Sequence, residues 1–138
     1  QAQEPAAPPA AALPVDPAER LCRLGATPGL DCQRGLEAMG GNVATYARLL
    51  ALFVDSHAGD TASLAAGLAA RELDTLKTLA HTLKGSAGAI GAVRVTEAAT
   101  ALNAAVRLGA AAEEIDRLCK ALIGELDSLI DGIRKAIA

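Results

Sequence analysis

The prolines of this chain lie near its N-terminus, and this distribution constrains the fold more than any other feature. All six lie at or before Pro28, and the sequence from Asp31 onward contains none. Proline breaks helix interiors, whereas glycine marks the joints between helices. Alanine and leucine supply most of the apolar residues, and only 1% of residues are aromatic. Because strands prefer β-branched and aromatic residues, the chain is predicted to be all-α.

Two regions are predicted from the same distribution. Residues 1–30 have the composition of a Pro/Ala-rich linker, with a short helix predicted at 16–24, where Asp16 suits the cap and Pro17 the first helical position. Residues 31–138 are predicted to form one domain. The sequence begins with Gln1 rather than Met, so we expect it to belong to a longer protein.

Apolar residues recur at three- and four-residue steps through the second region, which predicts amphipathic helices. The first helix is short, is capped by Asp31 and ends at Gly40-Gly41. The second, capped by Asn42, is predicted as one long helix over residues 43–70 that Gly59 bends, rather than two helices. Three more helices are predicted over residues 72–89, 92–108 and 113–137. These lengths and short links predict an antiparallel up-down-up-down four-helix bundle, preceded by one or two short N-terminal helices.

One predicted helix carries His81, one of only two histidines in the chain. On a helical wheel the apolar residues of this helix share one arc, and His81 lies on the opposite side, toward solvent. Lys77 and Lys84 lie one turn away from it. Gly85 and Gly88 lie beside it on the outward face, although a glycine inside a helix costs about 1 kcal/mol relative to alanine. Two glycines next to an exposed histidine suggest that a bulky partner approaches the imidazole closely.

The segment that starts at His81 closely resembles the signature of histidine-containing phosphotransfer (HPt) domains. It reads His-Thr-Leu-Lys-Gly-Ser-Ala-Gly and is followed by Ile90-Gly91-Ala92. The resemblance covers roughly residues 31–138 and includes Gly35-Leu36, Gly40-Gly41-Asn42, Tyr46, Leu49-Leu50 and Phe53. In such domains the histidine accepts a phosphoryl group from one response-regulator receiver domain and passes it to another.

Chemistry and resemblance together assign a role to each residue of the outward face. His81 is the expected phosphoacceptor, because a neutral imidazole is a nucleophile. Lys84 disfavours the imidazolium form and attracts phosphoryl oxygens. Gly85, Gly88 and Lys77 are expected to form the access and docking face for the partner. The resemblance implies that the receiver supplies the aspartyl phosphate and Mg²⁺. We therefore expect a phosphocarrier with no cofactor, metal or ATP site of its own, rather than an enzyme.

Other residues depart from the HPt pattern or carry no predicted chemistry. Asn103 stands where the family often has glutamate, and Glu72 and Leu73 stand where an aspartate followed by an aromatic residue is common. Glutamate is the poorer N-cap. His57 lies on the inward seam of its helix and is predicted to be buried and hydrogen-bonded. The three cysteines show no Cys-x-x-Cys spacing, so reduced thiols are expected.

Charge and hydropathy limit the expected partners. The net charge of −3 gives no electrostatic case for nucleic acid or an anionic membrane, and no apolar run approaches the length of a membrane span. We expect a cytoplasmic monomer that acts on receiver domains, as the C-terminal module of a hybrid sensor histidine kinase. Two alternatives stay open: the phosphoacceptor domain of a chemotaxis-type histidine kinase, and a helical adaptor or dimerisation bundle without phosphate chemistry.

Overall fold

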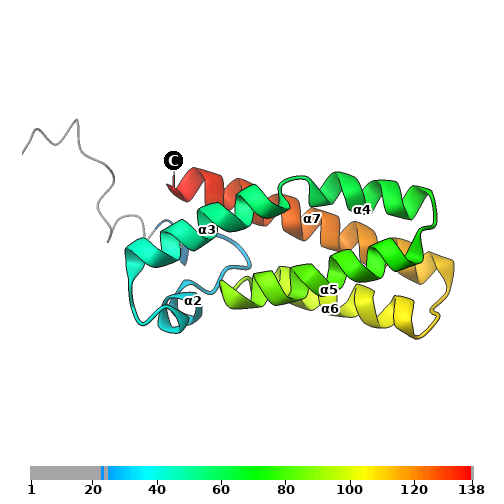
Figure 1. The fold of residues 1–138 in the computed structure, drawn as a ribbon, viewed down its shortest axis with the longest axis horizontal. Helices are drawn as coiled ribbons and strands as arrows, with labels where there is room; N and C mark the ends of the chain where they lie inside the picture. The colour runs from blue at the N-terminus through cyan, green and yellow to red at the C-terminus, as the bar shows by residue number, and fades with distance from the viewer. Residues whose placement is uncertain (1–22, 24, 138) are drawn as a thin grey trace, which may run out of the picture.

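The computed structural model describes residue 23 and residues 25–137, and this part of the chain is an all-α bundle. The helices are α2 (Cys32–Ala38), α3 (Val43–His57), α4 (Asp60–Ala69), α5 (Leu73–Ala89), α6 (Val93–Arg107) and α7 (Ala112–Ile137). In Figure 1, α3 and α4 follow one another along one side, α5 and α6 run along the other, and α7 lies behind them. The predicted all-α helical bundle is confirmed. Most of the short helix predicted at 16–24 lies outside the described residues.

The prediction of one long helix over residues 43–70 is wrong, because the helix is interrupted after His57. The regular backbone hydrogen bonds of α3 stop at Ala58, and α4 starts beyond Gly59. Glycine lowers helix stability, and the Nδ1 atom of His57 lies 2.7 Å from Oδ2 of Asp60 across the joint. Both joint residues keep right-handed helical backbone angles, so the apolar seam continues in phase through the break. Periodicity alone could therefore not reveal it.

Side-chain caps start the first two described helices as the sequence predicts. Oδ1 of Asp31 accepts a hydrogen bond from the N–H of Arg34 at 3.0 Å, and Oδ1 of Asn42 accepts one from the N–H of Thr45 at 2.9 Å. Such caps satisfy amide groups that have no partner within the helix. The core lies between the inward faces of α3 to α7, and its largest fully buried side chains are Tyr46, Leu50, Leu64, Leu76, Leu83, Val95, Leu102, Leu122, Leu126, Leu129 and Ile133.

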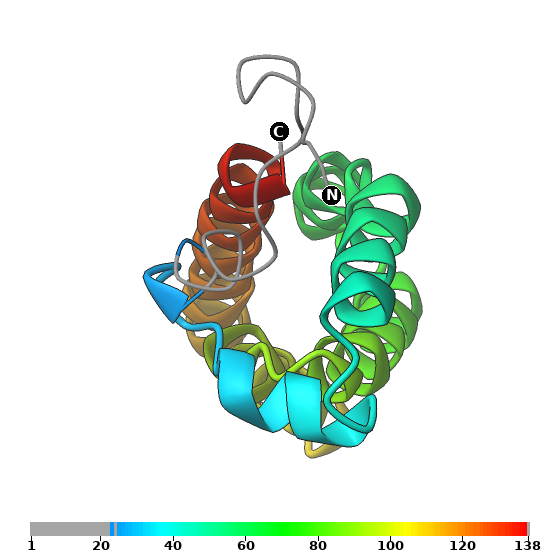
Figure 2. The ribbon, with the colours of Figure 1, turned by 90° about the vertical axis from the view of Figure 1, so that its left-hand side faces the viewer.

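The short helix α2 is fixed to the turn between α5 and α6. Figure 2 shows it lying across that end of the bundle. The hydroxyl of Tyr46 donates to the carbonyl oxygen of Ile90 at 2.7 Å, and the N–H of Asp31 donates to the carbonyl oxygen of Gly91 at 2.7 Å. Gly35 lets α2 approach, because a Cβ there would lie 2.5 Å from both the Ile90 oxygen and the Tyr46 ring. These contacts hold the C-terminal end of α5 in place.

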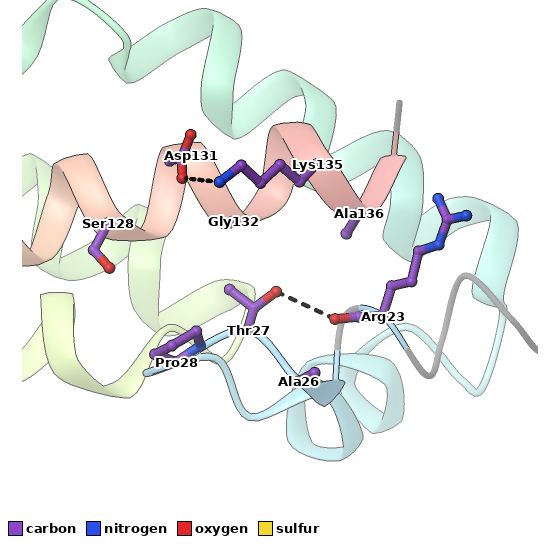
Figure 3. Close-up of a pocket in the computed structure, with 9 residues that line it drawn as sticks. All are labelled: Arg23, Ala26, Thr27, Pro28, Ser128, Asp131, Gly132, Lys135 and Ala136. Carbon is purple, nitrogen blue, oxygen red and sulfur yellow. Dashed lines mark hydrogen bonds and ion pairs between the residues drawn. The ribbon is translucent and has the colours of Figure 1, made fainter.

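The segment before α2 packs along α7. Thr27 is buried, and a Cβ on Gly132 would lie 2.6 Å from its Cγ2, so this glycine permits the close approach (Figure 3). Leu30 forms an isolated antiparallel bridge with Ala92. Beside this segment lies a cavity of about 450 Å³, whose polar lining residues are Arg23, Thr27, Ser128, Asp131 and Lys135. Thr27 and Leu30, which make these contacts, belong to the predicted linker range 1–30. The predicted boundary between the linker and the domain at residue 30 stays a prediction.

Replacing Gly35 with alanine should destabilise the bundle by about 1–3 kcal/mol, because the added methyl group overpacks the contact with Tyr46 and Ile90. Gly124→Ala is the matched control, since a Cβ at this exposed position inside α7 meets no atom within 4 Å. That variant should gain up to about 1 kcal/mol from helix propensity. Urea unfolding followed by circular dichroism measures both changes. Equal stabilities for the two variants would contradict the packing described for α2.

Tyr46, the only tyrosine of the chain, should resist ionisation while the protein is folded. Burial raises the pKa of its phenol, and the charges of the Cys32 thiolate, once that thiol ionises, and of the Asp31 carboxylate raise it further. The folded-state pKa therefore exceeds the unfolded value of about 10, so the stability contribution is complete below pH 10 and falls as the pH rises above it. Alkaline titration of tyrosinate absorbance should show ionisation together with unfolding. An ordinary titration curve of a protein that remains helical would contradict the burial of this phenol.

Candidate functional site

The apolar stripe of α5 sets the rotation of this helix and thereby the direction of His81. Leu76, Ala80, Leu83 and Ala87 are each fully buried against the rest of the bundle. They recur at three- and four-residue steps, so they occupy one face of the helix. His81 lies on the other face and is exposed to solvent. The orientation predicted for this side chain agrees with the structure.

The two glycines beside His81 are not required for packing within the described chain. Gly85 and Gly88 are both exposed. A Cβ built on Gly85 would meet no atom within 4 Å, and one on Gly88 would meet only Oγ1 of Thr96, at an ordinary contact distance of 3.9 Å. Alanine would therefore fit at both positions and would favour the helix. Packing within the bundle therefore does not explain why these two positions are glycine.

A surface depression of about 490 Å³ brings His81 together with residues from two helices. Lys77, Thr78 and Lys84 line it from α5, and Asn103 and Arg107 line it from α6. Among the predicted site residues, His81, Lys84 and Lys77 thus share one depression. The predicted docking residues Gly85 and Gly88 lie on the same exposed face outside it, and Gly88 lines a second depression with Arg34 and Thr96.

Three lining residues were not predicted from the sequence: Thr78 on α5, and Asn103 and Arg107 on α6. The amide of Asn103 donates from Nδ2 to the carbonyl oxygen of Lys77 at 3.1 Å, and its Oδ1 accepts from Nε of Arg107 at 3.1 Å. The sequence shows Asn103 only as a departure from the HPt pattern. The antiparallel pairing of α5 with α6 places both α6 residues in the depression that contains His81. The sequence could have indicated this only if the two predicted helices had been aligned with one another in space.

The depression is positively charged. Nζ of Lys77 lies 4.0 Å from Oδ1 of Asp74, and both side chains are exposed, so this ion pair is weak. Lys84 makes no ion pair within the part of the chain that the structure describes. Among those residues, no group of three or more His, Cys, Asp or Glu side chains could hold a metal ion. A nucleophilic imidazole among cations suits the transfer of an anionic group such as phosphoryl.

Comparison with protein families decides what kind of domain carries this site. The sequence model described as the Hpt domain matches residues 48–136, a range that includes His81 and every residue lining the depression. The chain belongs to the Hpt domain family. Hpt domains are phosphocarrier modules that interact with response-regulator receivers, so this Hpt domain has a histidine phosphotransfer role in a two-component phosphorelay.

The search among curated proteins gave no significant match, and the search among solved structures gave none either. No helix within residues 23 and 25–137 has both the length and the apolar character that crossing a membrane requires.

Gly85→Ala should separate the stability of this Hpt domain from its reaction with a protein partner. The methyl group meets open space, so the variant should be more stable by about 0.5–1 kcal/mol. Transfer from a phosphorylated receiver should nevertheless slow by about tenfold or more, because a small displacement of the reacting groups is costly. Thermal unfolding and rapid-quench kinetics measure the two effects. Phosphorylation by phosphoramidate, a small donor, is the control and should not change; an unchanged receiver reaction would argue against close approach at Gly85.

Proposed function

We propose that His81 accepts a phosphoryl group from the aspartyl phosphate of one receiver domain and passes it to the aspartate of another. The observation that carries this proposal is the exposure of His81 on a helix whose opposite face is fully buried, within the range matched by the Hpt domain family. A side chain in this position can enter the active site of another protein without disturbing its own fold.

The nucleophile that this chain supplies to the transfer step is a neutral imidazole. The unprotonated ring nitrogen of His81 attacks phosphorus, a P–N bond forms, and the P–O bond to the receiver's aspartate breaks. The electron pair of that bond goes to the aspartate, which leaves as a carboxylate, and the other ring nitrogen then releases its proton to solvent. The second transfer is the reverse reaction with a different receiver. Catalysis of such steps depends on in-line positioning and on neutralising the charge of the phosphoryl oxygens.

The remaining residues of the face support this reaction in the proposal. Lys84 would neutralise charge on the phosphoryl group from one turn away, and Lys77 would contribute to docking. Gly85 and Gly88 would admit the rim of the receiver's active site, and the receiver would bring the Mg²⁺. The chain would need no ATP site of its own. We propose that it acts as a monomer in the cytoplasm, as the C-terminal module of a hybrid sensor histidine kinase.

The test uses both histidines of the chain. When the protein is incubated with a radiolabelled phosphorylated receiver, the wild type should acquire acid-labile, alkali-stable label, as expected for phosphohistidine. His81→Gln should acquire none, because the nucleophile is gone, whereas His57→Gln should keep the label once circular dichroism shows that it is folded.

Each other outcome points elsewhere. Label that persists in His81→Gln would remove the assignment. Label acquired only from the ATP-bound catalytic domain of a kinase would indicate the phosphoacceptor domain of a chemotaxis-type kinase. A stable homodimer with His81 covered would indicate an adaptor bundle.

A further inference from the structure

We infer that Arg107 is a second cation for the phosphoryl group on His81, and that Asn103 positions it. This inference rests on the proposed function of His81 and assigns two residues of α6 to the same reaction. Neither residue lies on the helix that carries the histidine, and both line the depression that contains it.

The hydrogen bonds of Asn103 fix where the guanidinium lies. Arg107 is the last residue of α6, and its Nε donates to Oδ1 of Asn103, one turn earlier. The side chain therefore folds back along α6 instead of extending past the end of the helix. The hydrogen bond from Asn103 to Lys77 places these two residues side by side. Because α5 and α6 are antiparallel, the side chain of Arg107 then points in the direction that leads along α5 from Lys77 to His81.

Asn103 is itself held by α5. Its Nδ2 donates to the carbonyl oxygen of Lys77, the same oxygen that α-helical geometry pairs with the N–H of His81. One amide thus connects the backbone turn that precedes the histidine to the guanidinium in the depression. A glutamate, which is frequent at this position in the family pattern, could accept from Arg107 but has no N–H to donate to Lys77.

The terminal nitrogens of Arg107 remain available for an anion. Only its Nε has a hydrogen-bond partner within the part of the chain that the structure describes. The two terminal NH₂ groups carry four N–H donors in a planar arrangement that matches two phosphoryl oxygens. Lys84 approaches the same depression from α5. The phosphoryl group on His81 would therefore be neutralised from two helices.

Both cations should preserve phosphohistidine. Positive charge beside the ring opposes protonation of the ring nitrogen that carries no phosphoryl group. The P–N bond breaks most readily when that nitrogen is protonated, because the leaving group is then neutral imidazole rather than an imidazolate anion. Positive charge also attracts an anionic phosphoryl donor. Removing Arg107 should therefore slow the formation of phosphohistidine and speed its hydrolysis.

The test uses the full chain and phosphoramidate, with ³¹P NMR to follow the formation and hydrolysis of phosphohistidine. Arg107→Ala should lower the initial rate and shorten the half-life, each by about two- to fivefold, which is the range for charge pairs in an exposed site. Arg107→Lys should recover part of both effects. Asn103→Ala should show an intermediate loss. Arg117→Ala is the control, because this exposed α7 arginine pairs with Glu114 away from the depression.

Two further measurements exclude a merely structural explanation. The melting temperature of Arg107→Ala should stay close to that of the wild type, since the residue is exposed at a helix end. The kinetic difference between the two proteins should shrink at high salt, where charges in an exposed site are screened.

The possible failures are distinguishable. Wild-type and Arg107→Ala proteins with equal rates and half-lives would overturn the inference and leave the role of His81 intact. An Asn103→Ala variant equal to the wild type, beside a defective Arg107→Ala, would overturn the positioning by Asn103. A wild type in which phosphoramidate does not label His81 would instead count against the proposed function.

Discussion

The burial of one face of α5 is the constraint on which the rest of the site depends. Leu76, Ala80, Leu83 and Ala87 have no exposed surface, so the helix cannot rotate without bringing apolar side chains into water. Full burial of a leucine alone stabilises by about 1.5–3 kcal/mol, so this setting is strongly preferred over alternatives. The outward direction of His81 is thus a consequence of packing on the far side of its helix. The hydrogen bond from the Tyr46 hydroxyl to the carbonyl oxygen of Ile90 and the close packing at Gly35 hold the C-terminal end of α5, so the helix cannot slide along its axis.

The sequence was sufficient for the features that follow from local rules. Helix boundaries near Asp31, Asn42 and Gly91 were predictable because caps and glycine turns act within a few residues. Burial of His57 was predictable from its place on an apolar seam, and the Hpt family from the contiguous motif around His81. The all-α bundle followed from composition and periodicity.

Features that depend on spatial neighbours or on weak local preferences could not be predicted in this way. The interruption between α3 and α4 leaves the apolar seam in phase, so a wheel projection is the same with or without it. Likewise, Arg107 meets the depression only because α6 returns antiparallel to α5 and Asn103 turns the side chain back. A helix considered alone contains neither fact. For the interruption between α3 and α4, the missing information was a small difference in backbone free energy at one glycine. For Arg107, it was the tertiary arrangement of two helices.

The exposed position of His81 has a consequence for how information would pass through this chain. A group attached to a solvent-facing ring displaces no packed neighbour, so the bundle would have nearly the same conformational free energy with and without it. The covalent group itself, rather than a change of shape, would then be the signal. Such a carrier adds no bias of its own, and the direction of flow would depend on the relative amounts and chemical potentials of the proteins on either side of it.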